Sequence, residues 1–244
     1  MVTLSTEARN VIFAAKCAGT VVGAIYARAM EVCARHWEVL NPLSHTGLAP
    51  RSDTARQMLA DATNVAAVRA AKEQAGVAAW LYRASALLGL DLSGSHLGTA
   101  TRFEQTLYTG DRDQKGILRY LECGASYNVN EFLRVDIPGS HLPLIIAGEA
   151  KGGSGGYGWV SGPNDLLANE LNVKAINQRD PAYALTRAAY MAKDGGTSAA
   201  SVARREAGRE IRRAFNQGNF MYLAVRGEID GTTLSVEGEV FECR

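Results

Sequence analysis

The chain has 244 residues, of which 47% are hydrophobic and 21% are charged, close to the average for a globular protein. This composition excludes a disordered tail, a collagen-like fibre and a low-complexity linker. The formal net charge is +1, so no global positive field surrounds the protein, and any binding of nucleic acid requires a local basic patch.

The four cysteines and the four histidines lack the spacing of a disulfide framework or a zinc site. We expect the cysteines to be reduced core thiols in a protein that folds in the cytosol. They are Cys17, Cys33, Cys123 and Cys243. The N-terminal residues do not resemble a signal peptide. The most apolar stretch, residues 11–27, is interrupted by Lys16 and is short for a bilayer crossing, so we expect no stable membrane span.

Residues 1–100 are rich in alanine and are predicted to form an all-helical domain. A first helix is expected to end before Pro42. A second helical run over about residues 52–90 is expected to break near Thr63 or Gly76. We expect this domain to serve in delivery or entry, or to be structural.

Residues 101–244 mix helix and strand signals, which predicts an α/β or α+β domain with a central mixed sheet flanked by helices. The predicted helices cover about residues 101–123 (as one helix or two), 181–193 and 198–217. The predicted strands cover about residues 130–137, 144–151, 220–225 and 232–241.

The apolar run 144–151 ends in Glu149-Ala150-Lys151 and is followed by two glycines. Because isolated charges are costly to bury, a carboxylate and an ammonium at the end of a buried strand indicate a function. Period-two geometry places Glu149 and Lys151 on the same face of the sheet. There the glutamate can ligate a divalent metal ion, and the lysine can orient a water or stabilise negative charge. The alternative is a salt bridge on an edge strand.

This apolar strand with Glu-Ala-Lys-Gly-Gly resembles the core motif of the PD-(D/E)XK nuclease superfamily. More narrowly, it resembles the nuclease domains of bacterial polymorphic toxins, including those of contact-dependent growth inhibition. Residues 178–183 are similar to the Gln-x-x-Pro-x-Tyr that opens the helix after the motif strand in those toxins, and Met191-Ala192 matches a Met-Ala pair in that helix. Residues 215–226 are similar to their helix, Asn-Gly turn and Tyr-Leu-x-Val-Arg strand. The resemblance covers about residues 120–227, under half of the chain.

The resemblance implies a restriction-endonuclease-like fold for residues 101–244 and a metal-dependent endonuclease that cleaves DNA or RNA, tRNA included. Glu149 would bind Mg²⁺, with Mn²⁺ or Zn²⁺ as substitutes, and Lys151 would position the attacking water. Gln178 would hold Lys151 or the scissile phosphate. It also implies a toxin made in the bacterial cytoplasm, exported, and active in the cytoplasm of a competing cell, with a cognate immunity protein. The alternative is a non-catalytic adaptor module that keeps a nuclease-like fold.

The superfamily also needs an acidic residue on the preceding strand, as a further catalytic and metal-binding carboxylate, and two residues compete for this role. Asp136 precedes Glu149 by a spacing that is common in the superfamily, so motif grounds favour Asp136. A tight hairpin just after Asp136 would carry it away from Glu149. If residues 138–143 form the loop instead, Glu149 pairs near residues 130–132 and Glu131 becomes the closer carboxylate.

The predicted helix 198–217 carries five arginines and two glutamates between residues 204 and 213. These arginines either contact the phosphate backbone of the substrate or pair with Glu206 on a solvated helix face. They are Arg204, Arg205, Arg209, Arg212 and Arg213. The three tryptophans are expected to pack in the interior, with stacking of Trp159 on a base as the alternative. The glycine-rich stretch 152–162 lacks the closing Gly-Lys-Ser/Thr of a phosphate loop, which disfavours nucleotide triphosphate hydrolysis.

Overall fold

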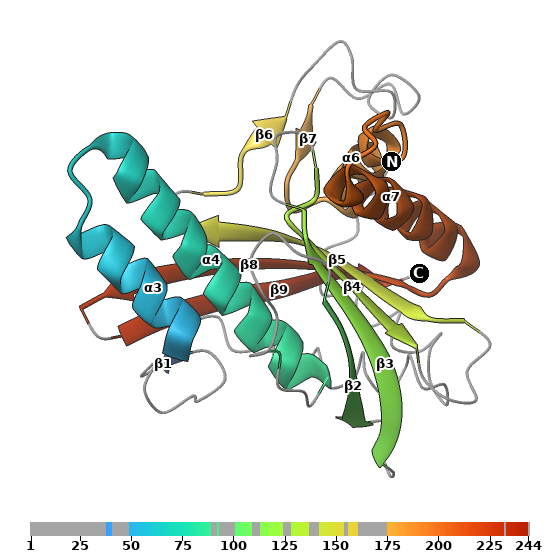
Figure 1. The fold of residues 1–244 in the computed structure, drawn as a ribbon, viewed down its shortest axis with the longest axis horizontal. Coiled ribbons are helices and arrows are strands. Elements are labelled where there is room, and N and C mark those ends of the chain that lie inside the picture. The colour runs from blue at the N-terminus through green and yellow to red at the C-terminus, as the bar shows by residue number, and fades with distance from the viewer. Residues whose placement is uncertain are drawn as a thin grey trace, which may run out of the picture.

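The computed structural model describes residues 38–40, 49–88, 92, 101–108, 113–123, 128–136, 142–153, 156–160, 175–231 and 233–243. Its main sheet has the strand order β1-β9-β8-β5-β4-β3-β2 (Figure 1). These strands are β1 (Glu38–Leu40), β2 (Thr101–Tyr108), β3 (Asp113–Glu122), β4 (Glu131–Asp136), β5 (Leu144–Gly152), β8 (Phe220–Asp230) and β9 (Thr233–Cys243). The β5–β8 pair is parallel and every other pair is antiparallel, so the sheet is mixed.

Helices cover both faces of this sheet (Figure 1). One face carries α4 (Val65–Leu88), with α3 (Ala49–Ala60) packed beside it. The other face carries α6 (Pro181–Met191) and α7 (Ala199–Gln217). A separate two-stranded ribbon of β6 (Trp159–Val160) and β7 (Ile176–Asn177) lies between β5 and α6 in the chain. The molecule therefore has three layers, with the central strands β5 and β8 enclosed between the two helical layers.

Each helical layer has its own apolar core against one face of the sheet. On the α4 face, Trp80 packs with Ile146 and Leu223, all fully buried. On the α6–α7 face, Ile211 packs with Ala147 and Tyr222. Because β5 and β8 are buried on both faces, both of their alternating residue sets are apolar, which explains their continuous hydrophobic runs.

The close approach of α4 to β5 depends on glycines. A Cβ at Gly152 would overlap the carbonyl oxygen of Lys72, and one at Gly76 would lie 2.5 Å from the carbonyl carbon of Lys151. A Cβ at Gly148 would overlap the indole of Trp80, whose Nε1 donates to a backbone carbonyl of β8 at 3.0 Å. The glycines that follow the Glu-Ala-Lys triplet therefore have a packing role, independent of any role in chemistry.

This packing corrects the predicted domain boundary at residue 100. Helix α4 shares one core with the sheet, and β1 pairs with β9 at the sheet edge. Residues 49–88 are therefore not an independent all-helical domain among the described residues, although both helices were expected. The helical run breaks at Thr63, as predicted, and continues through Gly76, which lies against β5.

The predicted helix over residues 101–123 is wrong, because this segment forms the β2–β3 hairpin. Its apolar residues, such as Leu118 and Leu121, lie on opposite faces of a sheet that is buried on both sides. Such a pattern gives no clear period, and a helix and a strand are then hard to distinguish. The predicted first helix lies outside the described residues except for Glu38–Leu40, which form a strand.

The other expected elements are confirmed. Strands β4, β5, β8 and β9 and helices α6 and α7 fall on the predicted segments. Asp180 caps α6 by accepting from the backbone of Ala182, and Ser198 caps α7 by accepting from that of Ser201. Gly218 ends α7 with a left-handed φ of 78°. None of the described helices has an apolar stretch long enough to cross a membrane.

Candidate active site

The site is centred on Glu149 near the end of β5. Glu149 is only 1% exposed, and its Oε1 lies 2.7 Å from the Nζ of Lys151, which is half-buried. Both side chains therefore share the α6–α7 face, as the alternation of the strand predicts. Because β5 lies between β4 and β8, this ion pair is not on an edge strand.

Gln178 contacts the Glu149 carboxylate from the segment between β7 and α6. It follows β7 and stands just before the cap of α6, and its Nε2 donates to Glu149 Oε1 at 2.7 Å. Its Oε1 accepts from the backbone N–H of Gly158 at 2.8 Å, and its carbonyl accepts from the Tyr222 hydroxyl at 2.6 Å. Gln178 thus contacts the glutamate, and it acts on Lys151 only through the oxygen that both donors share.

Two residues of α6 complete the surroundings of the carboxylate. Tyr183 receives a hydrogen bond from Gln178 at 3.4 Å, and the guanidinium of Arg187 lies 4.7 Å from the Tyr183 ring centroid. Both residues are buried. Tyr183 is the tyrosine of the Gln-x-x-Pro-x-Tyr resemblance, whereas Arg187 was not singled out from the sequence. The position of Arg187, four residues after Tyr183, was the available signal, because residues at this spacing lie on the same face of a helix.

Burial dominates the electrostatics of Glu149. Desolvation raises the pKa of its carboxyl, while Lys151, Arg187 and Tyr183 act in the opposite direction without cancelling the rise. Burial and the nearby Glu149 charge also raise the pKa of Tyr183, and they raise that of Tyr222 well above its usual range. Both phenols are therefore neutral hydroxyls at physiological pH, and each can donate a hydrogen bond.

One oxygen of the carboxylate is left without a hydrogen bond. Glu149 Oε2 is buried and has no hydrogen-bond partner among the described residues. Buried carboxylate oxygens are usually satisfied, and a divalent cation is one group that would satisfy this one. The described residues contain no group of three or more Asp, Glu, His or Cys side chains that could hold a metal ion. A cation here would therefore depend on Glu149 together with neutral oxygens.

The structure separates Asp136 from Glu149. Val135 pairs with Leu144, so Asp136 lies at the opposite end of the β4–β5 hairpin, more than about 16 Å along the strands from Glu149. Asp136 forms an ion pair with Arg134 at 2.8 Å. The favoured prediction that Asp136 and Glu149 bind one metal ion is therefore wrong, because the loop follows residue 136 and the register of the hairpin carries the two apart.

Glu131 is close in register but lies on the wrong face. It pairs with Gly148, as expected for a loop at residues 138–143, yet the residue opposite Gly148 faces α4. Its fully buried carboxylate accepts from the Tyr120 hydroxyl at 2.5 Å, within the core beneath α4. Since Glu149 faces α6, the sheet itself lies between the two carboxylates. The prediction of Glu131 as the partner acid is therefore also wrong.

Asn130 directly precedes β4 and adjoins the Glu131–Gly148 pair. Its backbone N–H donates to Gly148 at 3.0 Å, and its Nδ2 donates to the carbonyl of Ala150 at 2.8 Å. Asn130 alternates with the buried Phe132 of the α6–α7 core, so it shares the face of Glu149. With the amide nitrogen engaged, Oδ1 is the atom available as a neutral oxygen ligand. A search limited to acids missed this residue.

The arginines of α7 are not brought to Glu149. The buried side of α7, which includes Ala207, Ile211 and Ala214, faces the sheet. Arg204 pairs with Asp194 at 3.2 Å, and Arg205 donates to the backbone of the same turn. The other three are exposed and form no ion pair with any described residue; they are Arg209, Arg212 and Arg213. The predicted role in substrate binding therefore has no geometric support at this site.

The expected pairing of Glu206 with arginines of its own helix is also wrong. Glu206 lies 3.8 Å from Arg119 of β3. Glu210 lies 2.6 Å from Arg119 and 3.2 Å from Arg134. Both glutamates thus tie α7 to the sheet, which leaves the exposed arginines as an unbalanced positive face.

Other cations stand nearer to the site. Arg226 of β8 pairs in parallel register with Lys151, so both side chains lie on the same face. The exposed Lys72 of α4 runs along Gly153, because a Cβ there would lie 2.9 Å from its Cδ. These residues come from three different elements, and spacing along the sequence could not associate them.

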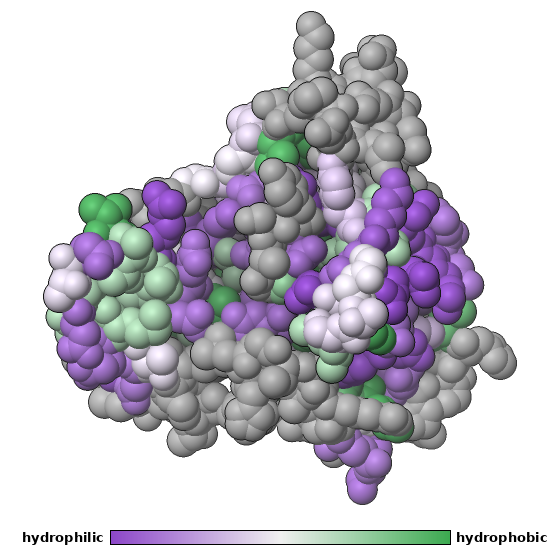
Figure 2. Space-filling view, turned by 45° about the horizontal axis from the view of Figure 1, so that its top comes forward, coloured by the Kyte–Doolittle hydropathy of each residue, from purple (hydrophilic) through white to green (hydrophobic). Residues whose placement is uncertain are grey.

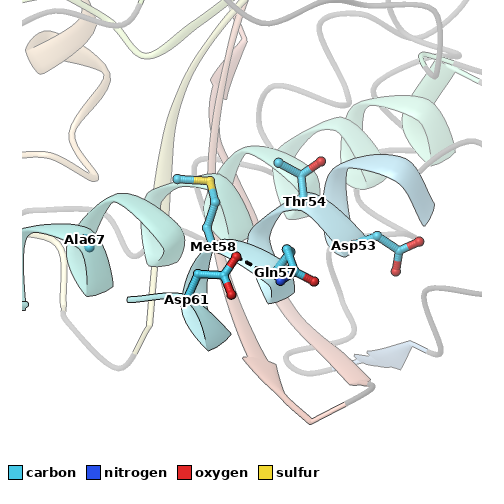
Figure 3. Close-up of a pocket in the computed structure, with 6 residues that line it drawn as sticks. All are labelled: Asp53, Thr54, Gln57, Met58, Asp61 and Ala67. Carbon is cyan, nitrogen blue, oxygen red and sulfur yellow. Dashed lines mark hydrogen bonds between the residues drawn. The ribbon is translucent and has the colours of Figure 1, made fainter. Parts of the chain in front are cut away.

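The surface view shows a hollow between the α3–α4 side and the α7 side, with hydrophilic residues on its floor and along α7 (Figure 2). A distinct cavity of about 630 Å³ lies between α3 and the start of α4 (Figure 3). Its two acids are already paired, Asp53 with Arg56 and Asp61 with Gln57. This cavity does not include Glu149 and carries no sign of chemistry.

Comparisons with known proteins add no relative: no family model matches the chain, and no curated protein or solved structure is significantly similar to it.

Proposed function

We propose that this protein is a metal-dependent nuclease. The observation that carries the proposal is the buried Glu149, which holds Lys151 and Gln178 on one oxygen and whose second oxygen has no hydrogen-bond partner among the described residues. The net rise in its pKa means that the ionised form is unfavourable for folding even beside a lysine. A carboxyl placed in so unfavourable an environment favours a functional role over a structural salt bridge.

In this proposal each residue has a defined task. Glu149 Oε2 and Asn130 Oδ1 supply oxygen ligands for Mg²⁺ or Mn²⁺, which when bound would polarise the scissile phosphate and acidify water. Lys151 orients the attacking water and offsets the charge that develops on the phosphate oxygens. Gln178 holds the Glu149 carboxylate in place and so fixes the position of Lys151. Lys72 and Arg226 extend the positive surface along which a phosphate backbone would lie.

The resemblance to polymorphic toxins supports a further assignment, a toxin that acts on DNA or RNA of a competing bacterium. A producing cell would then need an immunity protein. The exposed arginines of α7, which form no ion pair within the described part of the chain, suit an acidic inhibitor, because complementary charge speeds association. In this assignment, Arg209, Arg212 and Arg213 bind the inhibitor, and the cations around Lys151 bind the substrate.

One observation favours the second candidate, a non-catalytic adaptor. Neither Asp136 nor Glu131 reaches Glu149, so the described part of the site has one carboxylate where the resembling nucleases have two. A metal ion would be held less tightly by one acid and one amide than by two acids.

The test is cleavage of plasmid DNA and of total RNA by the purified chain, with Mg²⁺, with Mn²⁺ and with EDTA. We expect metal-dependent cleavage of at least one substrate, a loss of a hundredfold or more in Glu149→Gln, and full activity in the matched control Asp136→Asn. Cleavage that persists in EDTA or in Glu149→Gln contradicts the proposed site. Absence of both cleavage and Mn²⁺ binding by calorimetry supports the adaptor.

A further inference from the structure

Trp159 of β6 is exposed beside the candidate active site. The expectation of a packed tryptophan is wrong at this position, because 71% of Trp159 is exposed. The other large exposed apolar residues in the described part of the chain are Val65 of α4 and Leu142, which precedes β5. They lie on other elements, so Trp159 is not part of a described apolar patch of the kind that marks a protein interface.

The ribbon that carries Trp159 is tied directly to Glu149. Trp159 pairs with Asn177, which precedes Gln178. The backbone N–H of Gly158 donates to Gln178 Oε1 at 2.8 Å, and Gln178 Nε2 donates to Glu149 Oε1 at 2.7 Å. These two bonds keep the Gly158 nitrogen within about 8 Å of the carboxylate. The backbone of the ribbon is therefore anchored close to the carboxylate.

The residues around this ribbon are cationic and aromatic. The guanidinium of Arg179 lies 4.9 Å from the ring centroid of Tyr157, and the Nζ of Lys151 lies 2.7 Å from the Glu149 carboxylate. An exposed aromatic ring near cations is the combination that binds single-stranded nucleic acid, since the ring stacks on a base and the cations contact the backbone. A base inside a duplex is already stacked and cannot offer its face to the ring without being flipped out.

We propose that Trp159 is a stacking platform for an unpaired nucleobase of the substrate. The inference rests on the proposed nuclease function and narrows it: the preferred substrate is single-stranded or looped nucleic acid. The hydrogen bonds through Gln178 tie the ribbon that carries Trp159 to the candidate cleavage site.

The test measures binding in EDTA, where a metal-dependent enzyme cannot cleave. The full chain is titrated into a fluorescein-labelled single-stranded 12-mer and into the corresponding duplex. Trp159→Ala should weaken single-strand binding tenfold or more, whereas Trp159→Phe should retain most of the affinity. Val65→Ala, which removes another exposed apolar side chain, should bind like the wild type.

Unchanged single-strand affinity in Trp159→Ala, with an unaltered circular dichroism spectrum, overturns the proposal. An equal loss for single strand and duplex also overturns it, because stacking on an unpaired base predicts a selective loss. Cleavage with Mg²⁺ is measured in parallel. If the wild type binds through Trp159 but never cleaves, the nuclease function fails and the base-binding site stands.

Discussion

Replacement of Glu149 by glutamine separates a functional carboxylate from a structural salt bridge. The variant keeps the shape of the side chain and an oxygen that can accept from Gln178, but it removes the charge. In the wild type, burial raises the pKa of Glu149 above its ordinary value despite Lys151 at 2.7 Å, so ionisation opposes folding. Lys151 has 29% of its side chain exposed and can be solvated when its partner is lost.

The expected free energy of unfolding of Glu149→Gln at pH 7 is therefore within about 1 kcal/mol of the wild type, or higher, whereas breaking a fully buried pair costs about 3–5 kcal/mol. The sign of the pH dependence follows. A carboxyl with a raised folded-state pKa stabilises the fold below its unfolded pKa, and this contribution is lost as the pH rises through the folded-state pKa. Wild-type stability should fall over this window, while the variant lacks this contribution.

Urea denaturation between pH 4 and pH 8, with activity measured on the same samples, checks both parts. We expect the stability of the variant relative to the wild type to increase with pH, together with a loss of activity of a hundredfold or more at pH 7. A destabilisation of about 3 kcal/mol or more at pH 7 would refute the reasoning and make the pair structural.

Three other predictions concern Asn130, the packing of Gly152 and the toxicity of the chain. Asn130→Ala should lower metal affinity and activity about 10- to 100-fold, and Asn130→Asp should preserve or raise both. Calorimetry with Mn²⁺ measures the metal affinity. An Asn130→Ala variant with unchanged affinity and activity would exclude Asn130 from the site. Gly152→Ala should destabilise the fold by about 1–3 kcal/mol, because the added Cβ would overlap the Lys72 carbonyl. The control Gly156→Ala has open space around it and should not destabilise the fold. Equal melting temperatures for the two variants would contradict the α4–β5 packing. Expression of the chain should arrest bacterial growth and Lys151→Ala should not, and free high-level expression of the wild type with intact nucleic acids would count against a toxin.

The sequence was most informative where local chemistry and tertiary packing agree. Asp180 and Ser198 carry cap signals that set the starts of α6 and α7, and the apolar run before Glu149 is a strand buried on both sides. Glu149, Lys151 and Gln178 come together as the motif suggested. The β2–β3 hairpin was not predicted because its apolar residues pack into the cores on both faces of the sheet. The sequence then shows neither the 3.6-residue period of a helix nor the two-residue period of a strand.

The partner of Glu149 could not be read from spacing alone. A hairpin register fixes which residue lies opposite, and parity then decides the face, so a change of one residue moves a side chain through the sheet. Glu131 pairs with Gly148, one residue from Glu149, and lies on the opposite face of the sheet, whereas Asn130 alternates with Phe132 on the face of Glu149. The search for an acid excluded Asn130.

The central parallel pair determines when the site can form. Glu149 pairs in register with Ala224 of β8, a strand that is synthesised only after the ribbon, α6 and α7. Parallel pairing across so long a connection forms late, because the loop must close before the contacts stabilise it. During translation, β5 would therefore remain unpaired with β8, and a nascent chain would have no assembled site until β8 left the ribosome. If the proposed nuclease function holds, the chain would have no assembled site for most of its synthesis, and an immunity protein would have that time to bind.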